Sequence, residues 1–288
     1  MFYQEVMRMA LFQCNFISYV LMREIQINVI LPTISCPEAM SLIGSETKAS
    51  HAGKAPYPVL YLLHGFANNY TVWGRYTSME RYAEERQIAV VTISGENKGY
   101  RNLEASGDPN PMRQPDRHFD FLAYEVPEFV KANFNISNRP EDTYIAGLSM
   151  GSAGALFHSL SLPENFRAVG AFSGPLMDMQ AMFLTDEQKA AMTEADWDAG
   201  VSKEAKELAE AALAAGKKLP DYYIATGTQD SPEASAAFAR FLEKAGAKVY
   251  TNFSRPYGHE WQFWDESLLE FLDWIPRTDP YAGTKRKI

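Results

Sequence analysis

Several features that mark other protein classes are scarce in this sequence. Only two cysteines, Cys14 and Cys36, occur in 288 residues. Two thiols are too few for a disulfide framework or a thiolate metal site, so the sequence favours a reducing compartment, and we expect a cytoplasmic protein; a single Cys14–Cys36 bridge is the alternative. Basic residues are also in deficit, with 27 Lys and Arg against 36 Asp and Glu and a net charge of -9. So acidic a chain has no basic surplus to neutralise phosphates, and no nucleic-acid partner is expected.

Long apolar runs are missing as well. No stretch approaches the roughly 18 residues of a membrane span, so no membrane association is expected. Residues 9–22 are the one candidate for the hydrophobic core of a signal peptide, but Gln13, Asn15 and Ser18 interrupt it and Glu5 spoils a basic leader, while Met9 offers an alternative start. Walker, dinucleotide-binding and His-Glu-x-x-His patterns do not occur. We therefore expect neither a cofactor nor a metal.

What the sequence does contain is a regular succession of short apolar runs and amphipathic segments. Residues 25–31 alternate apolar and polar, which indicates an antiparallel or edge strand, whereas the later runs are continuously apolar, as in strands buried on both faces. The later runs are 59–63, 88–93, 143–146, 168–172, 222–225 and 249–253, and the helical segments are 77–86, 126–134, 152–160, 233–245 and 261–274. This order predicts an α/β fold with a mostly parallel central sheet flanked by helices.

The domain organisation is predicted to be simple. We expect a single domain over residues 9–288, with one irregularity at 177–218, where two helical blocks (187–192 and 203–215) replace the strand pattern. A helical insertion at the carboxyl ends of strands is where a lid over a site would lie. A longer crossover packed on the sheet explains the same residues equally well.

A candidate nucleophile stands between a predicted strand and a predicted helix. The segment Gly147-Leu148-Ser149-Met150-Gly151 matches the nucleophile elbow, a sharp turn that presents a serine at the edge of a sheet. The strained turn requires small residues two positions away, and the helix N-terminus adds partial positive charge where an oxyanion develops. Ser149 is therefore the predicted nucleophile, and an inert glycine-rich turn is the alternative interpretation.

A serine hydroxyl needs a base, and the chain has five histidines. His259 follows the last predicted strand and precedes the last helix, which places it at the same sheet edge as the elbow. His51, His64 and His158 are interpreted as structural, and His118, in a polar segment, is the weakest serious rival. We expect His259 to be the general base.

The base in turn needs a carboxylate that fixes its tautomer and stabilises its charge. In this type of fold the acid comes between serine and histidine in the chain. Asp230 satisfies this order, because it follows the predicted strand 222–225. Glu233 is the nearby alternative, but it begins a helix, where its charge complements the helix dipole.

An oxyanion hole completes the predicted site. Phe66 follows the buried strand 59–63 and Met150 follows the nucleophile, so their backbone N–H groups are the expected donors. Trp73 and Trp261 are candidate walls of a small apolar substrate pocket, although either is equally well explained as a core residue.

With these residues placed, the chain resembles the esterase-D-like group of the carbohydrate esterase family 1 superfamily, and particularly bacterial tributyrin esterases. The segments that carry the resemblance are 12–32, 62–65 with Trp73, 146–151, 172–174, 227–230 and 258–264. The resemblance implies the α/β-hydrolase fold and gives Ser149, Asp230 and His259 the triad roles. Two departures stand out: Ser152 replaces a usual glycine, and the loop 99–119 has no match, which leaves the substrate open.

The expected activity is hydrolysis of short-chain acyl esters through an acyl-serine intermediate. Acetyl to butyryl esters of a carbohydrate, or a phenolic ester such as feruloyl, are the expected small-molecule substrates. An acyltransferase on the same scaffold is the first alternative, and products formed with competing acceptors would distinguish it. A catalytically silent binding protein is the second, and it would not react with a fluorophosphonate. Related enzymes often associate, so a homo-oligomer is also considered.

Overall fold

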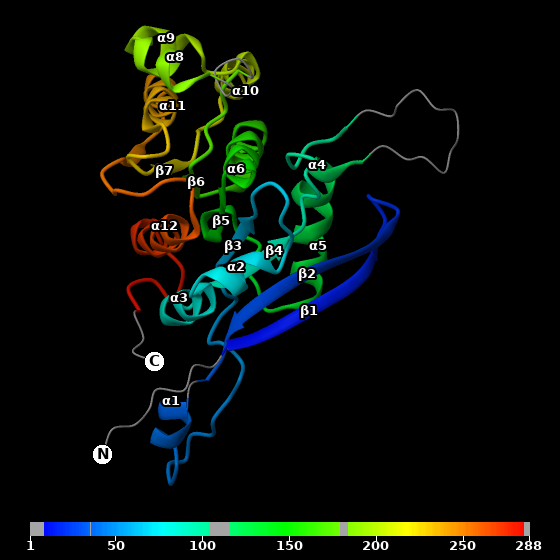
Figure 1. The fold of residues 1–288 in the computed structure, drawn as a ribbon. Helices are drawn as coiled ribbons and strands as arrows, with labels where there is room; N and C mark the ends of the chain where they lie inside the picture. Colours follow the sequence, from blue (N-terminus) through cyan, green and yellow to red (C-terminus); the bar gives the residue numbers. More distant parts are fainter. Residues whose placement is uncertain (1–8, 35, 104–115, 179–183, 285–288) are drawn as a thin grey trace.

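A computed structural model describes residues 9–34, 36–103, 116–178 and 184–284 of the chain. Within these ranges eight strands form one sheet in the order β1-β2-β4-β3-β5-β6-β7-β8 (Figure 1). The β1–β2 and β2–β4 pairs are antiparallel, and all later pairs are parallel. The strands are β1 (Met9–Ser18), β2 (Arg23–Pro32), β3 (Val59–Leu63), β4 (Ala89–Ile93), β5 (Thr143–Leu148), β6 (Ala168–Phe172), β7 (Asp221–Ala225) and β8 (Val249–Asn252). The mostly parallel α/β sheet expected from the apolar runs is confirmed.

Helices cover both faces of the sheet, and each face has its own apolar core. One core packs α5, α6, α10 and α11 on the sheet, with Val130, Leu156 and Phe238 at its centre. The other packs α2, α3 and α12, with Trp73 and Phe271. The helices are α1 (Cys36–Ser41), α2 (Val72–Tyr76), α3 (Met79–Arg86), α4 (His118–Asp120), α5 (Val126–Asn133), α6 (Met150–Ser161), α8 (Asp186–Ala191), α9 (Glu194–Ala199), α10 (Lys203–Ala214), α11 (Pro232–Lys244) and α12 (Trp261–Trp274).

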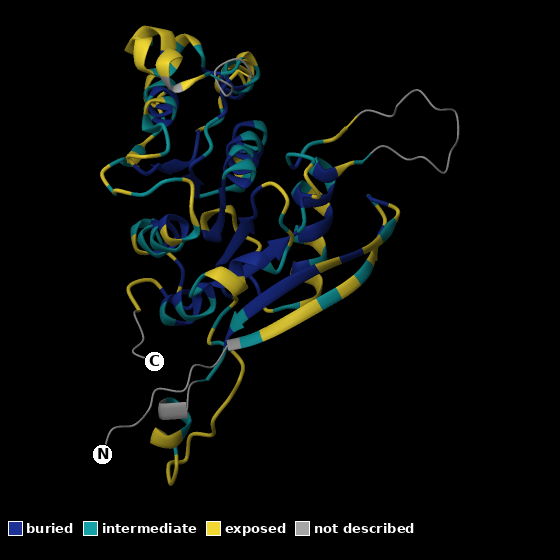
Figure 2. Ribbon diagram, viewed as in Figure 1, coloured by how far each residue is buried: buried dark blue, intermediate teal, exposed yellow. Residues whose placement is uncertain are grey.

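The described residues also form short helices of other types: the π-helix η1 (Phe121–Glu125) and the 3-10 helices η2 (Pro140–Asp142) and η3 (Pro163–Asn165). The central strands β3, β4, β6 and β7 are buried along their whole length and form the dark blue centre of Figure 2. This burial explains why their sequences are continuously apolar. Burial on both faces is what a parallel sheet between two helical layers requires.

The first strand, β1, was not expected from the sequence. Residues 9–22 are interpreted above as a rejected signal-peptide core, but the structure pairs β1 with β2 along ten residues. Phe16 stacks on Phe129 of α5, whereas Leu11 and Ile17 are exposed. Apolar residues on both faces hide the alternation that would have indicated a strand. β2 is antiparallel to its neighbours, as expected. The edge of the sheet, however, is formed by β1 and not by β2 (Figure 2).

The helical segment expected at 177–218 contains α8, α9 and α10; its residues 179–183 lie outside the described ranges. The short helix α9 was missed, although Thr193 caps it by accepting from the backbone N–H of Asp196. Buried Trp197, Ala205 and Ala209 join the core cluster that contains Leu156 of α6. The segment therefore packs on the helical layer of one sheet face, and its role as a lid stays a prediction.

The parallel strands bring their carboxyl ends to one edge of the sheet. The loops that follow β3, β4, β5, β6, β7 and β8 all leave from this edge, because these strands pair in parallel register. This is the edge at which open α/β sheets bind ligands. Among the described residues, no helix is long and apolar enough to cross a membrane.

Candidate active site

Ser149 occupies a strained turn between β5 and α6. Its backbone has φ 51° and ψ -119°, a conformation that costs a non-glycine residue of the order of 1–3 kcal/mol and persists only where the surroundings enforce it. The N–H of Ser149 donates to the carbonyl oxygen of Phe172 at 2.8 Å, and its own carbonyl accepts from Ala153 in the first turn of α6. The serine is thus fixed from both sides at the start of the helix.

The two glycines of the elbow are required by close packing. A Cβ on Gly151 would lie 2.5 Å from the carbonyl oxygen of Leu63 and 2.6 Å from that of His64, and a Cβ on Gly147 would collide with the backbone of Gly151. The helix that begins behind Ser149 therefore touches the end of β3. This contact brings the loop after β3 next to the nucleophile.

His259 and Asp230 form a hydrogen-bonded pair at the same edge. The Nδ1 atom of His259 lies 2.9 Å from Oδ2 and 3.1 Å from Oδ1 of Asp230. The side chain of His259 is 46% exposed, that of Asp230 only 18%. A carboxylate at Nδ1 leaves Nε2 of the same ring as the atom that can take a proton. The structure thus joins two of the three residues expected to form the triad.

Backbone contacts hold the loops that carry this pair. Thr228 donates its N–H to the carbonyl of Arg255 at 2.9 Å, and Gln229 donates to that of Tyr257 at 3.0 Å. Gly227 packs so closely on the Tyr257 carbonyl that a side chain there would collide with it. Asp230 and His259 therefore lie on two loops that are joined to each other by backbone hydrogen bonds.

The loop after β3 carries the expected oxyanion donor Phe66. Gly65 lies against the elbow, since a Cβ there would be 2.5 Å from Leu148 Cδ1 and 3.4 Å from Ser149 Cβ. Phe66 itself is 66% exposed, and its role as a donor stays a prediction. Met150, the second expected donor, is the first residue of α6, where backbone N–H groups have no partner within the helix.

Trp73 and Trp261 lie in contact, but in different surroundings. Trp73 is 1% exposed, and its indole N–H donates to the Leu63 carbonyl at 3.0 Å. Trp261 is half-buried, stacks on the exposed Tyr76 with ring centroids 4.9 Å apart, and meets Trp73 edge-on. A second edge contact links it to Trp264, whose ring in turn meets His259. Trp261 can touch a substrate directly, and Trp73 can act only through its neighbours.

The remaining histidines have structural surroundings. His158 is fully buried in α6, where it contacts the Tyr100 carbonyl at 2.8 Å, and burial lowers its pKa to about 4. His118 is 1% exposed at the start of α4, not in an exposed loop, and burial lowers its pKa. His51 is exposed in the polar segment before β3.

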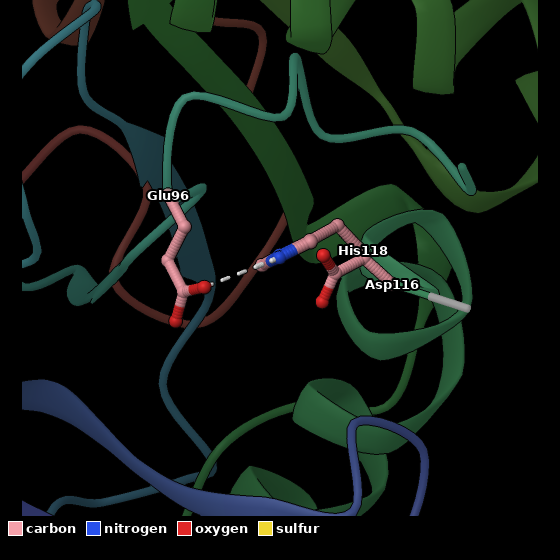
Figure 3. A group of neighbouring side chains, drawn as sticks. All are labelled: Glu96, Asp116 and His118. Carbon is pink, nitrogen blue, oxygen red and sulfur yellow. Dashed lines mark ion pairs between the residues drawn. The ribbon is translucent and has the colours of Figure 1, made fainter. Parts of the chain in front are cut away.

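One cluster has the composition of a metal site. Glu96, Asp116 and His118 can bring ligand atoms within 4.8 Å of one another (Figure 3). The guanidinium of Arg23, however, already lies 2.6 Å from Glu96 and 2.9 Å from Asp116. A divalent ion would have to displace this cation, which is already paired with both carboxylates.

A second cation, Lys98, lies 3.4 Å from Asp116. Burial raises the pKa of Asp116, but the hydrogen bonds from Arg23 and Lys98 outweigh it and leave that pKa below its usual value. The cluster is an ion-pair network that ties the loop after β4 to the start of α4.

Sequence reasoning missed two residues that support the site. Tyr100 is 1% exposed and donates its hydroxyl to the His64 carbonyl at 3.0 Å, and Asn97 accepts from the N–H of Ala67 at 2.6 Å. Both lie in or beside the loop 99–119, which matched no pattern and of which 104–115 lie outside the described residues. The one sequence feature that pointed to such a contact is Gly154, a glycine inside the helix after the elbow. It leaves room for Tyr100, because a Cβ there would lie 2.6 Å from the Tyr100 ring.

The family model described as "Putative esterase" matches residues 43–275. The chain belongs to this esterase family. An acetyl esterase of Caldicellulosiruptor saccharolyticus is 26% identical over 282 residues, which are 93% of this chain and 99% of the relative. The family and this relative confirm the esterase resemblance.

Solved structures of other esterases and serine hydrolases are similar to this chain in fold. FphF, a fluorophosphonate-binding serine hydrolase of Staphylococcus aureus solved with substrate bound, has a TM-score of 0.72 and 25% identity, covering 93% of this chain and 98% of FphF. The CE1 ferulic acid esterase AmCE1/Fae1A of Anaeromyces mucronatus has a TM-score of 0.61 at 18% identity, over 95% of this chain and 93% of that enzyme, and shows the shared fold. This esterase-family protein has the α/β-hydrolase fold and is a serine carboxylic ester hydrolase.

Proposed function

We propose that this esterase hydrolyses short-chain acyl esters through an acyl-serine intermediate, with Ser149 as nucleophile, His259 as general base and Asp230 as the residue that orients it. One observation carries the proposal: Nδ1 of His259 lies 2.9 Å from Asp230, on the sheet edge where Ser149 stands in a strained turn with φ 51°. A packed scaffold alone has no need of a strained serine and a carboxylate-paired histidine at one edge.

The chemistry proceeds in two halves. His259 Nε2 takes the Ser149 proton as Oγ attacks the acyl carbon, and the N–H groups of Phe66 and Met150 hold the oxyanion. The tetrahedral intermediate collapses, and the proton passes to the leaving alcohol. Water, deprotonated by His259, then attacks the acyl-serine; the carboxylic acid leaves and Ser149 regains its proton.

For the substrate, we propose an acetyl to butyryl ester of a carbohydrate or phenolic alcohol. The acetyl esterase relative supports a short acyl group, and the ferulic acid esterase neighbour shares the scaffold. Trp261, stacked on Tyr76, supplies an aromatic surface at the site, and buried Trp73 supports it from beneath. A cytoplasmic location and self-association stay predictions.

Hydrolysis of p-nitrophenyl acetate, butyrate and octanoate and of feruloyl methyl ester by wild type and Ser149→Ala tests the proposal. We expect turnover by wild type that falls with chain length, and a loss of about 10⁴-fold or more in the variant. Labelling by a fluorophosphonate should likewise depend on Ser149. Equal turnover by the two proteins would remove Ser149 from the mechanism, and acyl transfer to an added sugar in preference to water would identify a transferase.

A further inference from the structure

The ring of His64 makes two contacts that determine which nitrogen carries its proton. Nε2 lies 2.9 Å from the backbone nitrogen of Gly95, and Nδ1 lies 2.6 Å from the carbonyl oxygen of Gly65. A backbone N–H can only donate, so Nε2 must accept and carries no proton. The proton of the neutral ring is therefore on Nδ1, from which it is donated to Gly65.

The surroundings keep this ring neutral. His64 is 1% exposed, and burial lowers its pKa, although the bond to the Gly65 carbonyl acts in the opposite direction and the nearby His118 adds to the lowering. A proton on Nε2 would also place two donors face to face, the ring N–H and the Gly95 N–H. His64 is thus a fixed donor toward Gly65 and does not serve as a second base.

The bond to Gly65 has a consequence for the next residue. In a planar trans peptide the carbonyl of one residue and the N–H of the next point in opposite directions. The Gly65 carbonyl and the Phe66 N–H belong to one such unit. When His64 holds the carbonyl on its own side, the Phe66 N–H must point away from the ring.

This peptide unit lies beside the nucleophile, because a Cβ on Gly65 would be 3.4 Å from Ser149 Cβ. We propose that His64 is a positioning residue for catalysis: its Nδ1–H holds the Gly65 carbonyl and thereby aims the Phe66 N–H at the oxyanion. The inference rests on the proposed function, in which Phe66 is an oxyanion donor. Held before the reaction, such a donor needs no reorganisation as charge develops.

The loop after β4 fixes the other end of the imidazole. Gly95 packs so closely that a Cβ there would lie 2.5 Å from the Tyr100 ring. Glu96 and Asn97 have positive φ values of 43° and 58°, and the Glu96 side chain is tied to Arg23. Asn97 accepts from the N–H of Ala67, one residue beyond Phe66. The ion pairs of Arg23 with Glu96 and Asp116 therefore anchor the loop that orients His64.

Two amide variants separate the two contacts of the ring. The amide nitrogen of asparagine reaches the position of Nδ1 and can donate, whereas the amide oxygen of glutamine reaches the position of Nε2 and can accept from the Gly95 N–H. His64→Asn therefore keeps a donor for the Gly65 carbonyl and gives up the contact with Gly95, and His64→Gln does the reverse. His158→Gln, a substitution at a second buried histidine, is the matched control for disturbing the core.

The measurements are kcat and KM for p-nitrophenyl acetate, the inhibition constant of a trifluoromethyl ketone, and thermal stability. We expect His64→Gln to lower kcat about 10- to 100-fold and the affinity of the ketone by a similar factor, because the ketone adduct carries the oxyanion. KM should change little. His64→Asn should remain within a few-fold of wild type, as should His158→Gln.

Other outcomes overturn the proposal. Equal losses in the Asn and Gln variants, or a loss that follows thermal stability and is not matched in ketone affinity, would reduce His64 to a bracing residue. Long-range ¹H–¹⁵N correlation spectra of the wild-type imidazole give a test without any substitution, since a proton found on Nε2 contradicts the assigned tautomer. Fluorophosphonate labelling distinguishes the two hypotheses: an unaffected His64→Gln enzyme that still labels at Ser149 refutes this inference alone.

Discussion

The machinery on the two sides of Ser149 is held in different ways. On the oxyanion side, His64, Trp73 and Tyr100 are each 1% exposed, and their side chains bond to the backbone of the end of β3 and the loop that follows it. On the base side, the His259 side chain is 46% exposed, and its loop is held by backbone contacts to the loop after β7. In the proposed mechanism, the backbone groups that hold the oxyanion are thus fixed by buried side chains, and the imidazole that exchanges protons stays open to solvent.

The largest expected effect comes from the base side. Asp230→Asn should lower kcat roughly 10³- to 10⁴-fold at neutral pH, because an amide no longer stabilises the imidazolium or selects its tautomer. Initial rates with p-nitrophenyl acetate measure the change. Glu233→Gln is the matched control, one carboxylate further along the same segment; if it were the more damaging of the two, the acid role would pass to Glu233.

On the oxyanion side, Gly65→Ala should cost about 100-fold in kcat. The new Cβ would lie 2.5 Å from Leu148 Cδ1, so the loop must move away from the elbow, and a displacement of about 1 Å can cost this much. Gly74→Ala in α2 is the control, because the nearest atom to its Cβ would be 3.6 Å away, an ordinary contact. Comparable activity in the two variants would show that the oxyanion side is less rigid than its burial indicates.

Removing the aromatic surface should have a smaller effect that depends on the substrate. Trp261→Ala removes the ring that stacks on Tyr76, and we expect KM for feruloyl methyl ester to rise about 10-fold, as the loss of a contact worth about 1–1.5 kcal/mol implies. KM for p-nitrophenyl acetate should rise less. A uniform rise for both esters would assign Trp261 to the fold and not to recognition.

The smallest effect on activity is expected at His158, where the effect on stability depends on pH. Burial lowers the His158 pKa from 6.5 to about 4. Between these pH values the unfolded chain binds a proton at His158 and the folded protein does not. Stability is therefore fully present above pH 6.5 and falls as the pH drops from 6.5 toward 4, by up to about 3 kcal/mol for this residue.

Urea unfolding of wild type and His158→Gln between pH 4 and 7 measures this linkage. The variant should lose less stability on acidification than wild type, while kcat at pH 7 stays within a few-fold. His64 and His118, whose pKa values burial also lowers, and carboxyl groups with lowered pKa values such as Asp116 and Asp279 contribute to the slope that remains in the variant. Parallel curves for the two proteins would show that His158 accepts a proton in the folded state.

The sequence predicted those parts of the molecule that depend on local pattern. Central strands such as β3 are buried on both faces, so their composition is unambiguous, and the elbow is recognisable because two glycines flank Ser149 between a strand and a helix. β1 was missed because it carries apolar residues on both faces, with Leu11 and Ile17 exposed. α9 was missed because Trp197 is its one large apolar side chain, so no apolar residue repeats at helical spacing.

The supporting contacts of the site could not be predicted, because they join distant segments. Tyr100 reaches the His64 carbonyl from 36 residues away, and Arg23 reaches Asp116 from 93 residues away. No local periodicity encodes such pairs. His64 itself was recognised as structural, but its tautomer follows only from the position of the Gly95 N–H, which the loop geometry sets.

The late position of His259 in the chain has a consequence for biosynthesis. Glu260 alone separates His259 from α12, whose Phe263, Leu268 and Phe271 fill the core on one face of the sheet. The elbow that carries Ser149 and the loop that carries His64 are synthesised before His259, the proposed base. Under the proposed mechanism, Ser149 is therefore without its proton acceptor until His259 has been synthesised and α12 has packed on the sheet.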